Sequence, residues 1–131
     1  MLKLGPHSYQ ELVVWQKAMA LVDVIYDLAE KLPPRENFGL WSQVTRAAVS
    51  VVTNIAEGQP RGTSRDFGHF LTMAHGSLTE TETLVLVAIR RRYLTEDEAL
   101  PALNLASEVG KMLISLRAKI GWTRQDGRGS S

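Results

Sequence analysis

Apolar side chains recur along the chain three and four positions apart, which is helical spacing, in four separate segments. No segment alternates apolar and polar positions for long enough to predict a β-strand. Short joints containing proline or glycine separate the segments, and short joints favour antiparallel neighbours. The pattern therefore predicts an all-α fold, an antiparallel up-down-up-down four-helix bundle. The expected helices cover residues 8–32, 38–57, 64–92 and 96–120.

These helices form one domain with a short segment at each end. Residues 1–7 are an N-terminal extension, and residues 8–120 contain the bundle. Residues 121–131 are rich in glycine, serine and charge, so we expect a flexible tail.

Capping residues mark two of the expected helix starts. Ser8 with Glu11, and Thr95 with Glu98, have the spacing of a capping box, in which each side chain satisfies a free backbone N–H of the other residue. Pro101 lies about two turns into the fourth helix, where its missing donor predicts an irregular turn or a kink.

The first helix carries two apolar seams instead of one. The first seam consists of Leu12, Trp15, Met19, Val22, Tyr26 and Ala29, and the second of Val14, Ala18, Leu21, Ile25, Leu28 and Leu32. A four-helix bundle of this size has no further layer to cover so wide an apolar arc. We therefore expect one seam to face the bundle and the other to face a second subunit; the alternative is a well-buried helix in a monomer. The predicted interface consists of Val14, Ala18, Leu21, Ile25 and Leu28.

The composition narrows the functional class. The 131 residues include no cysteine and carry a formal net charge of +1, from 15 Lys and Arg against 14 Asp and Glu. The charge excludes a uniformly basic nucleic-acid coat protein, and the lack of cysteine excludes disulfides, thiolate zinc sites and cysteine catalysis. No apolar run reaches 18 residues and the first residues show no secretory signal, so we expect a cytoplasmic protein without a membrane span.

No pattern typical of catalysis is present. A di-iron bundle needs Glu-x-x-His pairs, and none occurs around the three histidines His7, His69 and His75. Residues 58–64 hold glycines and hydroxyls before a helix, but they lack the Gly-Lys-Ser/Thr core of a phosphate loop, so we interpret them as an inter-helix turn. We therefore predict no catalytic residue, no metal and no cofactor.

Polar residues form a stripe on the second helix, and an acidic residue on the third belongs with them. The stripe and its partner are Gln43, Arg46, Ser50, Asn54, Glu57 and Glu80. We interpret them as a structural polar network in which Arg46 pairs with Glu80 or Glu57. The alternatives are an arginine-led surface for an anionic partner and a small-molecule or catalytic site. Gly76 in the third helix costs about 1 kcal/mol relative to alanine, which suggests that another backbone approaches closely.

The near-zero net charge conceals an uneven distribution. In the predicted arrangement, one end of the bundle has an excess of basic residues, whereas the other end is balanced. Arginines near a helix N-terminus, together with its backbone N–H groups, are suited to bind phosphate. The predicted nucleic-acid contacts at the basic end are Arg61, Arg65, Arg117, Lys119, Arg124 and Arg128.

Several segments resemble one known family. They are residues 12–18, residues 38–40 with Gln43 and Arg46-Ala47-Ala48-Val49-Ser50, the Asn-Ile-Ala-Glu-Gly segment at 54–58 with Arg61, and residues 70–74 with Gly76-Ser77 and Glu80. On these residues the chain resembles the four-helix-bundle proteins named after intervening sequences in the 23S ribosomal RNA gene, also called S23 ribosomal proteins. The resemblance spans roughly residues 10 to 90 and implies a homopentamer without catalytic activity.

The resemblance and the residues together give three functional hypotheses. The first is a non-enzymatic oligomeric scaffold that binds RNA or a nucleoprotein. The second, implied by a related bundle, is an accessory protein of a diversity-generating retroelement that associates with its reverse transcriptase and template RNA. The third is a small-molecule-binding or catalytic bundle that uses Arg46, Asn54, Glu57 and Glu80.

Overall fold

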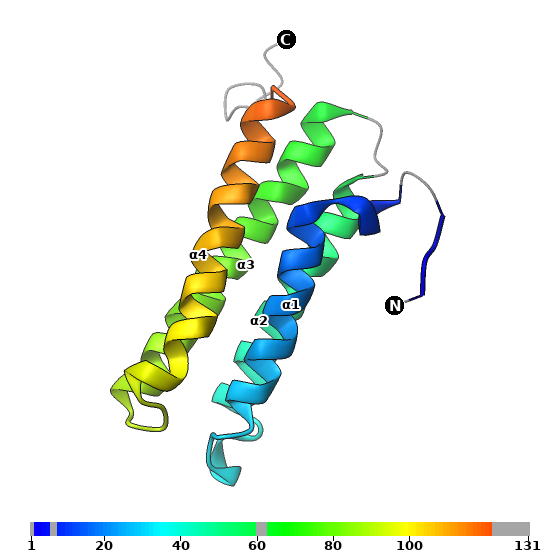
Figure 1. The fold of residues 1–131 in the computed structure, drawn as a ribbon. Coiled ribbons are helices and arrows are strands. Elements are labelled where there is room, and N and C mark those ends of the chain that lie inside the picture. Colours follow the sequence, from blue (N-terminus) through cyan, green and yellow to red (C-terminus); the bar gives the residue numbers. More distant parts are fainter. Residues whose placement is uncertain (1, 6–7, 60–62, 122–131) are drawn as a thin grey trace.

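The computed structural model describes residues 2–5, 8–59 and 63–121, and these residues form an all-α fold with four long helices (Figure 1). No strand occurs within these ranges. The helices are α1 (Val13–Ala29), α2 (Leu40–Gly58), α3 (Ser64–Arg90) and α4 (Glu96–Lys119), with short 3-10 helices at η1 (Tyr9–Glu11) and η2 (Pro34–Glu36). The all-α prediction is confirmed.

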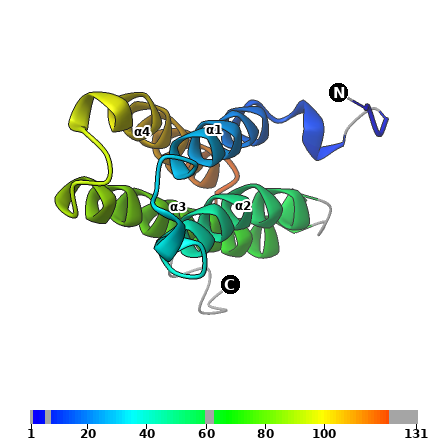
Figure 2. The ribbon, with the colours of Figure 1, turned by 90° about the horizontal axis from the view of Figure 1, so that it is seen from below.

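Side-chain contacts define how the helices run beside one another. Lys17 pairs with Glu108 and Lys31 with Glu98, so α1 and α4 are antiparallel. Ser50 and Ser77 share a hydrogen bond of 2.8 Å in the middle of α2 and α3. Seen from below, α1 and α4 form one layer and α2 and α3 the other (Figure 2).

The core fills the space where the four helices meet. Its fully buried side chains come from every helix, among them Leu21, Ile55, Leu78 and Leu113. An apolar gap beside Ile25, Val44 and Val85 measures about 10 Å³, which is room for no more than one water molecule. This gap has no space for a ligand.

The structure corrects the predicted subunit interface. Val14, Ala18, Leu21, Ile25 and Leu28 are each 6% exposed or less. Ile25 and Leu28 lie among Val44 of α2 and Val85 of α3, so this seam faces the centre of the bundle in one chain. These five residues are core, and no surface remains on them for a second subunit.

The other seam of α1 contacts α2 through Tyr26. The rings of Tyr26 and Trp41 meet edge to face, with centroids 6.0 Å apart. Met19 and Val22 are partly buried against the core, whereas Tyr26 remains 39% exposed. Trp15 and Ala29 of the same seam are buried, so the wide apolar arc of α1 is largely buried within a single chain.

The sequence predicts capping boxes at two helix starts, and only the Thr95–Glu98 box caps an α-helix. The Thr95–Glu98 box opens α4, and α4 continues as helix through Pro101. At the other start, the Ser8 hydroxyl accepts a hydrogen bond from the Gln10 N–H and caps η1, not an α-helix. The helix α1 covers Val13–Ala29, which is shorter than the predicted range 8–32.

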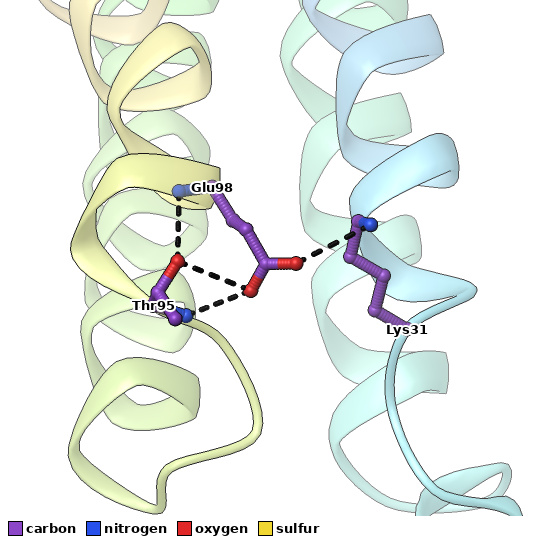
Figure 3. Close-up of polar contacts among 3 residues, drawn as sticks. All are labelled: Lys31, Thr95 and Glu98. Atoms are coloured by element: carbon purple, nitrogen blue, oxygen red, sulfur yellow. Dashed lines mark hydrogen bonds and ion pairs between the residues drawn. The ribbon is translucent and has the colours of Figure 1, made fainter.

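At the lower end of the bundle, the carboxylates of Glu36 and Glu98 link the α1–α2 turn to the α3–α4 turn. Glu98 accepts a hydrogen bond from the Thr95 backbone N–H and lies 3.3 Å from Lys31 Nζ (Figure 3). Glu36 accepts one bond from the Leu40 backbone N–H and another, of 3.0 Å, from the Tyr93 hydroxyl. These contacts tie the α1–α2 turn to the start of α4 and the residues before it.

The same contacts predict sensitivity to acid. Hydrogen bonds from the Leu40 N–H and the Tyr93 hydroxyl lower the pKa of Glu36, and the Thr95 N–H and Lys31 lower the pKa of Glu98. A carboxyl group whose pKa is lower in the folded state stabilises the fold above its unfolded pKa, near 4.5, and loses that contribution as pH falls through the folded pKa. We expect Tm to fall between pH 6 and pH 3 in a thermal scan followed by circular dichroism.

The control is the double variant Glu36→Gln/Glu98→Gln, which cannot titrate at these positions. Its Tm should be lower than that of the wild type at pH 6, and its fall on acidification should be smaller. An equal fall in both proteins would show that these two carboxylates do not contribute to acid sensitivity.

Candidate nucleic-acid interface

Three cationic side chains of the predicted contact set lie at the upper end of the bundle, where α3 begins and α4 ends (Figure 1). Arg65 is exposed at the second position of α3, and Lys119 is exposed at the last position of α4. Arg117 is half-buried, and its Nη1 donates a hydrogen bond of 2.9 Å to the Thr72 hydroxyl. This bond joins α4 to α3 and fixes the position of the guanidinium group.

The other three predicted contacts, Arg61, Arg124 and Arg128, lie outside the described residues. Within the described residues the basic character of this end is moderated by acids: Glu11, Glu57 and Asp66 are exposed there. Asp66 lies in the first turn of α3, which is capped by the Thr63 hydroxyl. The positive charge of this end therefore lies at separate points on α3 and α4.

A groove that sequence reasoning did not predict lies beside Lys119. It has a volume of about 310 Å³ and runs between the start of α1 and the end of α4. Its lining is mainly apolar, with Leu12, Val13, Met112 and Leu116, and Lys119 supplies the charge. Helical periodicity could not reveal it, because it depends on how two helices distant in sequence diverge at their ends.

The predicted polar network forms only in part. Asn54 Nδ2 donates hydrogen bonds to the backbone oxygen of Ser50, at 2.8 Å, and to its hydroxyl, at 3.1 Å. Ser50 in turn is bonded to Ser77 of α3. These half-buried groups connect α2 and α3, as a structural network requires.

The expected ion pair of Arg46 is absent within the described part of the chain. Arg46 lies within 4 Å of neither Glu80 nor Glu57 through its charged atoms, whereas Lys17 pairs with Glu108 and Lys31 with Glu98. Instead, Arg46 and Glu80 line a pocket of about 310 Å³ together with Gln43, Ala47 and Ser50. We call the surface formed by Gln43, Arg46, Ser50, Gly76 and Glu80 the α2–α3 face.

Two further observations concern the described residues alone. Within them, no group of three or more His, Asp or Glu side chains is arranged to hold a metal ion. None of the helices they form combines the length and the apolar character that crossing a membrane requires.

Comparisons with known proteins show which proteins this chain resembles. The model of the family described as "23S rRNA-intervening sequence protein" matches residues 10–115. The fold is also similar to a 1.70 Å crystal structure, a protein with unknown function from the S23 ribosomal protein family of Bacteroides thetaiotaomicron VPI-5482. The TM-score is 0.74 at 28% sequence identity, over 80% of this chain and 98% of that chain. Among curated proteins, no match was found.

Proposed function

Because the chain belongs to the 23S rRNA-intervening sequence protein family, we propose that it is a non-enzymatic homo-oligomer that binds RNA or a nucleoprotein. The observation that carries the proposal is the placement of Arg65, Arg117 and Lys119 at one end of the bundle, on two different helices. Repetition of such an end around an oligomer would produce a local positive field that the net charge of +1 conceals.

The small gap in the core also supports a binding role on the surface. A cofactor or buried substrate inside a bundle requires a cavity between the helices, and the gap beside Ile25 and Val85 measures only about 10 Å³. We therefore expect the partner to contact the outer surface. Exposed arginine and lysine side chains are the groups that bind the phosphate backbone of nucleic acids without reading sequence.

The apolar groove next to Lys119 adds a second type of contact at the same end. Its lining of leucine, valine and methionine side chains could bury the face of an unpaired base, while Lys119 contacts a phosphate. A surface of this composition favours single-stranded or looped RNA, whose bases are accessible, over a regular duplex.

Binding to a structured RNA with single-stranded loops tests this proposal. We expect the binding constant to fall steeply with salt, because each phosphate contact releases counterions. The double substitution Arg65→Gln/Lys119→Gln should reduce the slope of log K against log salt by about 2, since each lost phosphate contact removes about 1. Filter binding or fluorescence anisotropy at several salt concentrations measures this slope.

Arg90→Gln/Arg91→Gln provides the matched control, because both arginines are exposed but lie at the opposite end of α3. It removes the same charge and should leave the salt slope unchanged. If both double variants reduce the slope equally, the binding is a property of net charge and the basic end is not the interface.

A second candidate function is favoured by the pocket on the α2–α3 face. Its volume of about 310 Å³ is at the lower end of the range for small-molecule sites, and both a cationic and an anionic side chain reach it. Of the four residues in the small-molecule hypothesis, Arg46 and Glu80 line the pocket, whereas Asn54 and Glu57 do not.

A further inference from the structure

The pocket on the α2–α3 face carries two opposite charges that are not matched to each other. Arg46 of α2 and Glu80 of α3 both line it and are exposed, yet their charged atoms form no ion pair within 4 Å. Because the two groups stand apart and border an open volume of about 310 Å³, a ligand that carries both charges can lie between them. Such a ligand offers a carboxylate to the guanidinium group and an ammonium group to the carboxylate.

Hydrogen bonds between the two helices hold the inner side of this pocket in place. The inner side consists of the buried Ala47 and the half-buried Ser50. The Ser50 hydroxyl shares a hydrogen bond of 2.8 Å with the Ser77 hydroxyl of α3 and accepts one of 3.1 Å from Asn54 Nδ2. These bonds fix α2 against α3, so the pocket is formed before a ligand arrives and binding loses little conformational entropy.

Gly76 leaves the backbone of α3 bare one helical turn before Glu80, on the same face of the helix. A side-chain carbon built at Gly76 meets no atom within 4 Å, and the residue is exposed. A carbon at Gly58 or at Gly110, by contrast, would meet a side chain of the same chain at 2.6 Å or 3.2 Å, respectively. Glycine inside a helix costs about 1 kcal/mol relative to alanine. Since no contact within the described chain requires Gly76, we interpret it as a place where a group from outside approaches the backbone.

We propose that this pocket binds a small zwitterion of the α-amino acid type. Arg46 donates hydrogen bonds to the carboxylate of the ligand, Glu80 accepts hydrogen bonds from its ammonium group, and the ligand lies against the bare backbone at Gly76. The inference rests on the small-molecule function proposed for this pocket, and it names the class of ligand. It does not depend on RNA binding, because Arg65 and Lys119 lie at the upper end of the bundle and do not line the pocket.

The combination of charges favours a zwitterion over other charged ligands. Glu80 repels the phosphate groups of a nucleotide or an RNA, and Arg46 repels a simple amine. A ligand with both charges gains both attractions and faces neither repulsion.

Titrations of the full chain with matched small molecules test the proposal. Each of the standard L-amino acids is screened at millimolar concentration by saturation-transfer NMR, which detects weak binding to an assembly of any size. The tightest binder is then compared with two probes of the same carbon skeleton, the amine that lacks the carboxylate and the acid that lacks the ammonium group. For leucine these probes are isoamylamine and isocaproate. We expect at least one amino acid to bind, and both probes to bind about fivefold more weakly or worse.

Substitutions show which side chain recognises which group of the ligand. Arg46→Gln should weaken binding of the amino acid about fivefold or more and remove its advantage over the amine, because the carboxylate has lost its partner. Glu80→Gln should remove the advantage over the acid in the same way. Gly76→Leu fills open space, so it should weaken binding without lowering Tm. Arg65→Gln is the matched control, since it removes an exposed arginine outside the pocket and should leave every dissociation constant unchanged.

The outcomes separate this inference from the functions proposed above. It is overturned if no amino acid binds, or if Arg46→Gln and Glu80→Gln leave the dissociation constant unchanged. If the amine or the acid binds as tightly as the amino acid and Gly76→Leu blocks it, the small-molecule function stands and the zwitterion is wrong. A chain that binds none of the amino acids, amines and acids contradicts the small-molecule function as well. RNA binding is measured by its own salt titration, so its failure would not change these results.

Discussion

Leu21→Ala is expected to lower the free energy of unfolding by about 3 kcal/mol, and Leu21→Glu is expected to prevent folding. Leu21 is completely buried and is among the largest side chains of the core. Truncation removes apolar contacts and leaves a cavity, which costs about 2–5 kcal/mol for a buried leucine. An unpaired carboxylate at the same position has no partner and no water, so its burial costs far more. Urea denaturation followed by circular dichroism measures both effects.

Ala20 provides the control, because it is adjacent in sequence but exposed on α1. Ala20→Glu should change the free energy of unfolding by no more than about 0.5 kcal/mol. A Leu21→Glu variant that remains folded and becomes monomeric would show that this seam faces a second subunit, as the sequence pattern had suggested, and would contradict the structure.

Gly58→Val is expected to lower the free energy of unfolding by about 2–3 kcal/mol. A side-chain carbon at position 58 would lie 2.6 Å from Phe70 Cβ and 3.1 Å from Phe67 Cδ1. The Cβ atom of Phe70 is fixed to its backbone, so α3 itself must move away from the end of α2. Overpacking of this kind costs about 1–3 kcal/mol.

The same substitution at Gly76 tests whether position, not residue type, determines the effect. Gly76→Val meets open space, and valine is slightly better than glycine in a helix, so stability should be unchanged or rise by less than about 0.5 kcal/mol. Both variants are compared by urea denaturation at low protein concentration, where self-association contributes little. Equal losses at the two positions would contradict the assigned packing of Gly58.

The sequence predicted the four helices well because each carries a long periodic apolar pattern. It could not predict which neighbour covers each seam of α1. Periodicity shows that a helix has an apolar face, but the coverage of that face depends on contacts such as Tyr26 with Trp41, between residues of different helices. The prediction of a subunit interface on α1 therefore failed, although the seams themselves were identified correctly.

The same local motif predicted a helix start correctly at one position and incorrectly at another. The Thr95–Glu98 spacing produced the predicted cap of α4, whereas Ser8 and Glu11 have the same spacing but Ser8 caps a 3-10 helix. The expected second helix covers residues 38–57, yet Gly58 is the last residue of α2, and its lack of a side chain is needed for contact with α3.

For the candidate sites as well, the sequence showed which residues share one helix face but not how two helices meet. The stripe of polar residues on α2 was visible from spacing, and the family resemblance found in those segments was confirmed over residues 10–115. The distance between Arg46 and Glu80 was not visible, because it depends on the separation of two helices and on rotamers. The groove beside Lys119 was missed for the same reason.

Native mass spectrometry of the chain with and without a looped RNA tests the proposed function most directly. The chain alone should appear at a multiple of 14.5 kDa, from two copies upward, and with RNA the whole assembly should shift by the mass of the bound RNA. Raising the salt concentration should remove the RNA, because phosphate contacts release counterions. A single species at 14.5 kDa that does not change when RNA is added would contradict both the oligomer and the binding role.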